Sequence, residues 1–215
     1  MTPHIVVFDY GFGNVRSMVR ALLNVGAHVE LTNDIDTSIH ADGLVVPGVG
    51  AYAACMAGLL EAFGDDVVYT RISRNLPVLG VCVGEQVMFN EGNERGAQCA
   101  GLGLIGGCIE KLAAPVVPHM GWNTVCSPDD SHLMRGIENE RFYFVHSYAA
   151  HTNTDKAYHD DVFTQEYEEK VTTATYGSDT FIAAVEKGPL TVTQFHPEKS
   201  GHAGAKLLTN WIETF

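Results

Sequence analysis

The sequence predicts an α/β fold: a mixed, mainly parallel sheet flanked by helices, with a mostly antiparallel second half. Over residues 4–90, short apolar strand signals alternate with helical patterns. After Gly101, strand signals follow one another with few helical patterns between them. Strands joined by helical crossovers pair in parallel, whereas strands joined by turns pair antiparallel.

Composition limits the size and the class of the protein. A chain of 215 residues, 46% hydrophobic and 18% charged, can bury a large core, and we expect a single domain over residues 1–215. The formal net charge of −13 argues against binding to nucleic acid or to an anionic membrane, because both need a basic surface. Five cysteines without a C-x-x-C pair indicate a reducing, cytoplasmic environment.

We expect neither a signal peptide nor a membrane span. Residues 1–13 lack the basic and apolar regions of a signal peptide. Pro47 and two neighbouring glycines break the best membrane-span candidate, residues 43–60. Residues 151–170 form the most polar, loop-like segment, and the spacing of His151, His159 and Asp160 within it matches no standard metal site. We therefore expect no metal and no cofactor.

The first half divides into strands and helices in order. Apolar runs bounded by glycine, proline or polar residues predict strands over residues 4–9, 27–32, 43–46 and 77–81. Helical spacing predicts a helix from about Asn14 to Gly26, a second over 51–63, and a third over 83–90. Ligand sites lie beyond the carboxyl ends of parallel strands, so Asp9, the Pro47 loop and Cys82 are expected at one rim of the sheet.

The second half shows seven short strand signals and a closing helix at about 201–212. The strand signals cover residues 102–112, 115–118, 123–126, 141–148, 171–176, 181–186 and 190–195.

A cysteine lies at the sharpest predicted turn of the chain. Residues 78–86 run from an apolar strand through Gly80-Val81-Cys82-Val83-Gly84 into a helical stretch. Glycines on both sides of Cys82 allow a nucleophile elbow, which places the sulfur at the start of the helix. The unpaired N–H groups there favour a thiolate and can hold an oxyanion. Without these glycines, a small buried core cysteine would be the default interpretation.

A cysteine nucleophile needs a histidine that takes its proton and a third group that orients the histidine. His196-Pro197-Glu198 follows an apolar strand, and residues i and i+2 of an extended segment point to the same side, so Glu198 can hold His196. The order Cys, His, Glu disfavours an α/β-hydrolase, in which the acid precedes the histidine. His146 lies inside an aromatic stretch and is expected to be a hydrogen-bonded core or pocket residue rather than the base.

These motifs resemble the class I, triad-type glutamine amidotransferases, which implies a flavodoxin-like fold. The elbow and H-P-E are shared by many members of that class, whereas D-Y-G-x-G-N and P-H-M-G-W-N are specific to one subfamily. The whole chain resembles the glutaminase subunits of imidazole glycerol phosphate synthases through residues 9–14 with Ser17, 47–50, 101–105, 118–123, 143–148 and 196–201.

The resemblance implies an activity and a partner in histidine biosynthesis. L-glutamine is hydrolysed to L-glutamate and ammonia, and the ammonia passes to a separate (β/α)8-barrel cyclase subunit in a heterodimer. The cyclase combines it with a phosphoribulosyl aminoimidazole-carboxamide nucleotide and releases imidazole glycerol phosphate and aminoimidazole carboxamide ribonucleotide, a purine precursor.

The resemblance also assigns roles to residues. Cys82 is the nucleophile, His196 shuttles the proton and Glu198 orients His196. The implied oxyanion hole comprises Val83, Val49 and Gly50; the glutamine pocket comprises Gln86, His146, Ser147 and Tyr148; and the cyclase interface includes Asn14, Ser17, Trp122 and Lys199.

Two alternatives remain open. The glutaminase of another amidotransferase, for guanylate, anthranilate or pyridoxal phosphate synthesis, would share the triad but lack the stretch 119–123. A catalytically silent binding relative is disfavoured by the complete triad. The sequence departs from the family pattern at Val83, at Gly106 and at Glu85, where a large apolar residue is more usual.

Overall fold

The computed structural model describes residues 2–151 and 156–215. The elements of the first half are β1 (His4–Phe8), α1 (Val15–Asn24), β2 (His28–Thr32), α2 (Ile35–His40), β3 (Gly43–Gly48), α3 (Tyr52–Glu61), α4 (Gly64–Ser73), β4 (Val78–Cys82) and α5 (Val83–Gln86).

The second half is mostly strands, as expected. Its elements are β5 (Phe89–Glu94), β6 (Ala97–Ala100), β7 (Ile105–Lys111), β8 (His119–Thr124), β9 (Arg141–His146), β10 (Tyr148–Ala150), the 3-10 helix η1 (Asp160–Val162), β11 (Lys170–Tyr176), β12 (Asp179–Lys187), β13 (Leu190–Thr193), the 3-10 helix η2 (Pro197–Lys199) and α6 (Gly201–Ile212).

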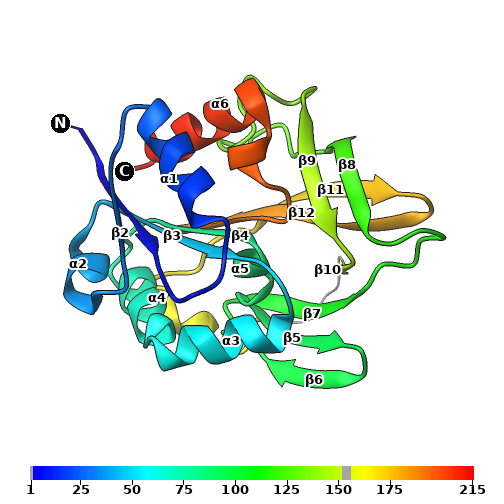
Figure 1. Ribbon diagram of the computed structural model, residues 1–215, viewed down its shortest axis with the longest axis horizontal. Coiled ribbons are helices and arrows are strands. Elements are labelled where there is room, and N and C mark those ends of the chain that lie inside the picture. The colour runs from blue at the N-terminus through cyan, green and yellow to red at the C-terminus, as the bar shows by residue number, and fades with distance from the viewer. Residues whose placement is uncertain (1, 152–155) are drawn as a thin grey trace.

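A seven-stranded sheet forms the centre of the molecule, in the order β11–β12–β13–β4–β3–β1–β2 (Figure 1). The strands from β13 to β2 pair in parallel, and β11, β12 and β13 pair antiparallel at the other end. The predicted mainly parallel sheet with an antiparallel second half is confirmed. β13 joins the two halves because it pairs directly with β4, so the strand before His196 lies beside the strand that ends in Cys82.

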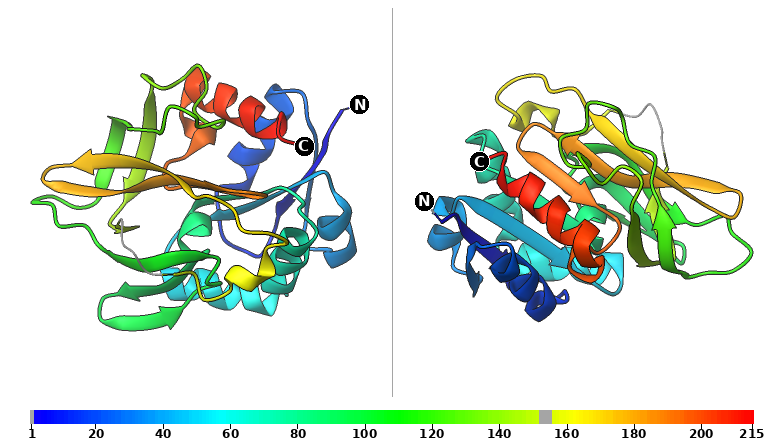
Figure 2. Two further views of the ribbon diagram at one scale, coloured as in Figure 1. Left: turned by 180° about the vertical axis from the view of Figure 1, so that it is seen from behind. Right: turned by 90° about the horizontal axis from the view of Figure 1, so that it is seen from above.

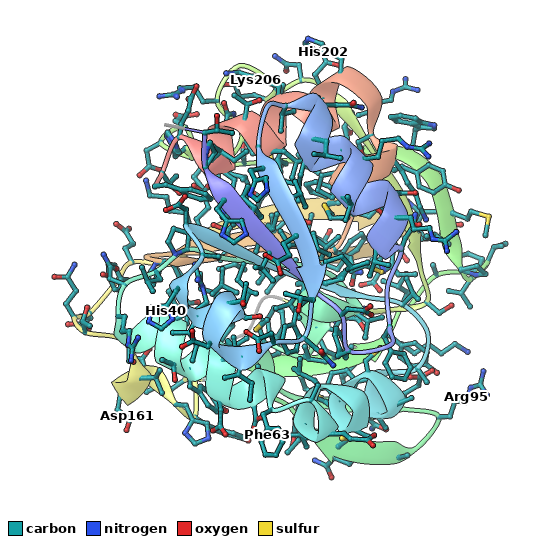
Figure 3. All side chains as sticks on the ribbon, turned by 60° about the vertical axis from the view of Figure 1, so that its left-hand side comes forward. His40, Phe63, Arg95, Asp161, His202 and Lys206 are labelled. Carbon is teal, nitrogen blue, oxygen red and sulfur yellow. The ribbon has the colours of Figure 1, made fainter. Side chains whose placement is uncertain are left out.

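Helices cover both faces of this sheet. α1 and α6 lie over one face, and α3 and α4 lie over the other (Figures 1 and 2). In Figure 3, His202 and Lys206 point outward from the α6 side, and Phe63 points outward at the opposite side, where α3 meets α4. Every residue of β3 and β4 is buried, which explains why these strands read as continuous apolar runs rather than as alternating patterns.

Two smaller sheets adjoin the central one. A four-stranded sheet has the order β10–β7–β5–β6, and β8 pairs with β9 as a two-stranded ribbon. In Figure 1 the ribbon lies beside the β11–β12 end of the central sheet. Within the described residues, no helix is long and apolar enough to cross a membrane.

The predicted helix over residues 83–90 was too long. α5 ends at Gln86, and the backbone then turns into β5. The carbonyls of Val87 and Met88 accept hydrogen bonds from the N–H groups of Leu102 and Leu104, at 2.7 and 2.9 Å. These carbonyls therefore bond to the segment at 102–104 instead of to a further turn of α5. The β5–β6 hairpin was missed because its polar residues carry no apolar alternation.

Three other expectations were wrong at their boundaries or in their type. Residues 115–118 are bends rather than a strand, since two of the four are prolines without an N–H group. The strand predicted at 123–126 begins earlier, at His119, and ends at Thr124. The strand predicted over 141–148 is interrupted by a bend at Ser147, which separates β9 from β10.

Two short helices were not predicted. α2 lies between two predicted strands, and the Asp34 carboxylate caps it by accepting a hydrogen bond from the Thr37 N–H at 2.8 Å. α4 begins directly after Phe63, which has a left-handed backbone with φ of +55°. In the loop predicted over residues 151–170, the regular structure among the described residues is η1 and the first residue of β11, Lys170, and 152–155 lie outside the described residues.

Candidate active site

Cys82 lies at the junction of β4 and α5 in a strained backbone conformation. Its φ is +57° and its ψ is −114°, values that non-glycine residues rarely adopt. The side chain is nearly buried, with 4% of the residue exposed. α5 contains a single helical turn, so it offers the sulfur local backbone N–H groups rather than the field of a long helix. This geometry is that of a nucleophile elbow.

The glycines around Cys82 are required by close backbone contacts. A Cβ atom on Gly84 would lie 1.9 Å from the Val46 carbonyl oxygen, and one on Gly80 would lie 2.6 Å from the Gly84 carbonyl oxygen. A Cβ on Gly48 would meet the Gly84 nitrogen at 2.4 Å. Gly80 and Gly84 thus allow β3, β4 and α5 to pack together.

His196 and Glu198 form a buried pair close to Cys82. The His196 Nδ1 atom lies 2.8 Å from Glu198 Oε1, and their side chains are 3% and 2% exposed. The predicted extended path is a 3-10 turn, but the turn still brings Glu198 onto the imidazole. The carboxylate can only accept, so Nδ1 donates and Nε2 is left free to take a proton. Nε2 is buried and makes no hydrogen bond to any residue that the structure describes.

Electrostatics favour a charged His196. Burial lowers the pKa of the imidazole, but Cys82 and Glu198 raise it more, and the pKa lies at about 9. The backbone holds the ring in place: the His196 N–H donates to the Tyr143 carbonyl at 2.9 Å, and the Ser200 hydroxyl donates to the His196 carbonyl at 2.7 Å. The histidine is therefore positioned to receive and keep the thiol proton.

A cavity of about 230 Å³ opens beside Cys82 and His196. It is smaller than the sites of about 300–1,000 Å³ that hold drug-sized ligands, and it suits a single amino acid. Its walls combine both halves of the chain and include all four residues predicted for the glutamine pocket. The lining residues are Val49, Gly50, Cys82, Val83, Gln86, Glu94, Val145, His146, Ser147, Tyr148, His196 and Lys199.

His146 is a buried, neutral residue in the wall of the cavity. Its Nδ1 atom lies 3.0 Å from the Tyr148 carbonyl oxygen, and its Nε2 atom lies 3.0 Å from Nδ1 of His119. The carbonyl can only accept, so His146 donates from Nδ1 and accepts at Nε2. Burial lowers the pKa of His146 to about 3 and that of His119 to about 4. Neither imidazole can serve as a cation near neutral pH.

The Pro47 loop is held from two sides. The Tyr10 hydroxyl donates to the Pro47 carbonyl, and the Cys55 thiol donates to the Val49 carbonyl at 3.2 Å. Burial raises the pKa of Cys55 to about 12, so this thiol stays protonated and remains a donor. Val49 and Gly50 lie at the end of this loop and line the cavity next to Cys82, at the rim where they were expected.

Glu85 is a buried carboxyl group beside the elbow. Only 2% of the residue is exposed, and neither carboxyl oxygen has a hydrogen-bond partner among the described residues. Burial raises its pKa well above the ordinary value, and the charge of Cys82 raises it further. The side chain therefore lies inside the fold as a neutral acid.

Glu85→Met is expected to stabilise the fold, and the gain should grow with pH. The pKa of Glu85 is higher in the folded protein than its ordinary value of 4.5. Below pH 4.5 the carboxyl is protonated in both states, so it does not reduce the free energy of unfolding. As pH rises from 4.5 toward the folded pKa, the carboxyl ionises only in the unfolded state, and the free energy of unfolding falls. Urea unfolding at pH 5 and pH 8 should show a gain of about 2 kcal/mol at the higher pH and a smaller one at the lower. Glu61→Met, at an exposed position, is the matched control. A gain that does not change with pH would contradict the buried neutral acid.

The residues assigned to the cyclase interface lie in different places. Trp122 is 53% exposed on β8, and Asn14 and Ser17 lie half-buried at the start of α1. Ser17 and Glu198 line a separate hollow of about 380 Å³ between α1 and α6. Lys199 lines the substrate cavity, and its ammonium lies 5.9 Å from the centre of the Tyr143 ring.

Three residues near the sulfur were missed from the sequence. Val145 and Glu94 line the cavity, and the Glu94 carboxylate also accepts the Tyr52 N–H at 2.8 Å at the start of α3. Gln194 is completely buried and its Nε2 atom lies 3.8 Å from the Cys82 sulfur. A polar residue at the end of an apolar strand, two positions before the base, was the available signal for Gln194.

Comparison with known proteins identifies the class of proteins to which this chain belongs. A family model described as "Glutamine amidotransferase class-I" matches residues 6–214. Solved structures agree in fold: "Structure of PurLQS from Thermotoga maritima" covers 100% of this chain and 99% of its own at a TM-score of 0.70 and 17% identity. "Crystal structure of glutamine amidotransferase" covers 96% and 98% at a TM-score of 0.69 and 18% identity. The chain belongs to the class I glutamine amidotransferases.

Similar curated proteins identify the family within that class. The chain is 60% identical over 210 residues to imidazole glycerol phosphate synthase subunit HisH of Bifidobacterium longum, covering 97% of this chain and 98% of the relative. It is 56% identical to the protein of the same name from Streptomyces coelicolor, with 98% and 93% covered. Within the class, the chain is a member of the HisH family.

Proposed function

We propose that this chain hydrolyses L-glutamine to L-glutamate and ammonia as the glutaminase subunit of imidazole glycerol phosphate synthase, in histidine biosynthesis. The observation that carries the proposal is that Cys82 and His196 line one small cavity, while Glu198 holds His196 from outside it at 2.8 Å. We also propose that residues 1–215 act as one domain, since elements from both halves build this site.

The first chemical step forms a thioester. His196 Nε2 takes the proton of the Cys82 thiol, and the sulfur attacks the side-chain amide carbon of glutamine. The carbonyl oxygen becomes an oxyanion, for which the Val83 N–H and the Val49–Gly50 loop are the proposed donors. His196 returns the proton to the amide nitrogen as the carbon–nitrogen bond breaks. Ammonia leaves, and the glutamyl group stays on the sulfur.

The second step hydrolyses the thioester. His196 takes a proton from water, the hydroxide attacks the thioester carbon, and the sulfur leaves and recovers its proton from His196. Glu198 holds the ring with Nε2 facing the site in both steps and stabilises the imidazolium. Glutamate is released, and the site returns to its initial state.

The cavity walls also suit a zwitterionic amino acid. Besides the His196 imidazole, they carry a cationic side chain, Lys199, and an anionic side chain, Glu94. These charges can complement an α-carboxylate and an α-ammonium group. Gln86 and the 146–148 stretch supply amide, hydroxyl and backbone groups. We propose that these residues bind glutamine and that Lys199 also contributes at the cyclase interface.

An apolar face next to the site is the proposed contact for the (β/α)8-barrel cyclase. Met120 and Trp122 are 62% and 53% exposed on the same face of β8, and Val116, three residues before this strand, is 66% exposed. Trp122 pairs with Tyr143 across the β8–β9 ribbon, and the Tyr143 carbonyl holds the His196 backbone. A partner on this face would therefore lie one strand away from the triad, and a covered route would keep ammonia from protonation in water.

Another synthase is the alternative partner. The solved structure named for PurLQS is 17% identical and indicates only the shared fold. The stretch 118–123, P-H-M-G-W-N, and the relatives at 50–60% identity favour the cyclase instead.

The experiment is reconstitution with the cyclase. The two chains should co-purify, and the cyclase's nucleotide ligand should increase glutaminase activity in the complex. Strong activity of the isolated chain would contradict control by the partner. Co-purification with a different synthase would favour the alternative.

Trp122→Ala is expected to weaken the complex by about 30-fold, because an exposed tryptophan at an interface commonly contributes about 2 kcal/mol to binding. Titration calorimetry measures the change. Phe63→Ala is the matched control, since Phe63 is 56% exposed at the junction of α3 and α4, where no partner contact is proposed. If Trp122→Ala binds the cyclase with unchanged affinity, the cyclase contacts a different surface of this chain.

A further inference from the structure

Gln194 completes the surroundings of the reacting sulfur. Its Nε2 atom lies 3.8 Å from Cys82 Sγ, within the range of an N–H···S hydrogen bond. The residue has no exposed surface and is not among those that line the cavity. It therefore contacts the sulfur from behind, where substrate does not reach.

A chain of hydrogen bonds fixes which end of the Gln194 amide faces the sulfur. Gln86 Nε2 donates to the Tyr148 carbonyl at 2.9 Å and to Gln194 Oε1 at 2.8 Å. The Tyr148 carbonyl can only accept, so the NH₂ group of Gln86 must lie on this side. The Gln194 oxygen therefore accepts the hydrogen bond from Gln86, and the Gln194 NH₂ group faces the Cys82 sulfur.

The backbone of Gln194 is equally fixed. Its N–H donates to the Ala183 carbonyl of β12 at 2.8 Å. The next residue, Phe195, stacks on Phe142 with ring centres 4.3 Å apart. The amide is therefore pre-positioned and needs no rearrangement when the charge on the sulfur changes.

We infer that Gln194 is a further catalytic residue, whose amide NH₂ group stabilises the Cys82 thiolate. A donor N–H interacts more strongly with an anionic sulfur than with a neutral thiol. It therefore favours the ion pair that forms when the Cys82 proton moves to His196. The same donor stabilises the sulfur when it leaves the thioester. This inference rests on the proposed role of Cys82 as nucleophile.

Other groups that act on the sulfur are unchanged by a substitution at Gln194. They come from several elements and include bases, acids and weak donors. These groups are His196 after β13, Glu85 on α5, Cys55 on α3 and Tyr10 after β1. Glu94 and Lys199 line the cavity beside the sulfur.

Gln194→Met tests the inference on the full-length chain, because methionine is similar in shape and has no donor. Iodoacetamide reacts with thiolate, and peptide mass mapping reports Cys82 separately from the other cysteines. At pH 7 we expect alkylation of Cys82 to slow by about 10-fold, as for loss of one hydrogen bond to a charged group, and its pH profile to move upward. In the cyclase complex, kcat for glutamine should fall while KM changes by less than about threefold.

Gln194→Glu is the second variant. It keeps an oxygen for Gln86 but removes the amide donor, and its alkylation should slow at least as much. Asn210→Leu is the control for loss of a buried amide, since Asn210 donates only to the Leu133 and Arg135 carbonyls among the described residues. It should leave the Cys82 pH profile unchanged.

The alkylation rates distinguish failure of the proposed nucleophile, Cys82, from failure of the proposed role of Gln194. If Cys82 of the unchanged protein reacts no faster than the exposed Cys126, the proposed nucleophile itself is wrong. If Cys82 reacts fast and the Gln194 variants keep the same rate and pH profile, only the role of Gln194 is overturned.

Discussion

Cys82→Ala is expected to lower the rate of glutamine hydrolysis by at least about 10⁴-fold, because loss of a triad nucleophile leaves only binding and the oxyanion hole. The folded structure should survive, since alanine fits wherever the small thiol fits. Glutamate release by the cyclase complex, with saturating nucleotide ligand, measures the effect. Among the described residues that line the cavity, Cys82 alone carries a thiol.

Cys126→Ala is the matched control for this substitution. Cys126 is exposed, and its backbone bridges to Thr173. Activity of this variant should equal that of the unchanged protein. Residual hydrolysis above about 1% in Cys82→Ala would mean that another group supplies the nucleophile.

Arg71→Met is expected to cost at least about 3 kcal/mol in the free energy of unfolding. The Arg71 guanidinium is completely buried on α4 and has no carboxylate hydrogen-bonded to it among the described residues. Instead it donates to five backbone carbonyls, those of Ser38, Ile39, Ala41, Asp42 and Pro77, at 2.8–3.2 Å.

These carbonyls belong to the segments that lead into β3 and β4. Methionine fills much of the space but leaves all five acceptors without this donor, and buried unsatisfied groups are costly. Burial lowers the pKa of Arg71 to about 10, so the guanidinium remains charged near neutral pH. Urea unfolding followed by circular dichroism measures the loss.

Arg74→Met is the control for Arg71→Met. Arg74 lies three residues further along and is exposed. Its unfolding free energy should change by less than about 0.5 kcal/mol. An equal effect at both positions would mean that loss of positive charge, rather than the five hydrogen bonds, destabilises the fold.

The sequence predicted the parts of the fold that depend on continuous apolar segments. β1, β3 and β4 were found because burial on both faces of the sheet requires uninterrupted apolar residues. α4 escaped prediction because its inner face is built around Arg71, whose burial depends on carbonyls from distant segments. A charged residue in a sequence gives no sign that such partners exist.

The candidate site divides in the same way. Cys82, His196 and Glu198 could be predicted because a sharp turn with flanking glycines and a histidine with a nearby acid are both visible in short motifs. Gln194 and Glu85 were not understood from the sequence. Their environments depend on which strands pair, since β13 lies beside β4, and this pairing joins residues more than 100 positions apart.

The most direct test of the central claim compares two nitrogen sources in the Cys82→Ala complex with the cyclase. Formation of imidazole glycerol phosphate is measured once with glutamine and once with ammonium salt at alkaline pH. The proposed function predicts no synthesis with glutamine and undiminished synthesis with ammonia, because the substitution removes only the ammonia supply. Loss of both activities, or synthesis from glutamine at the normal rate, would contradict it.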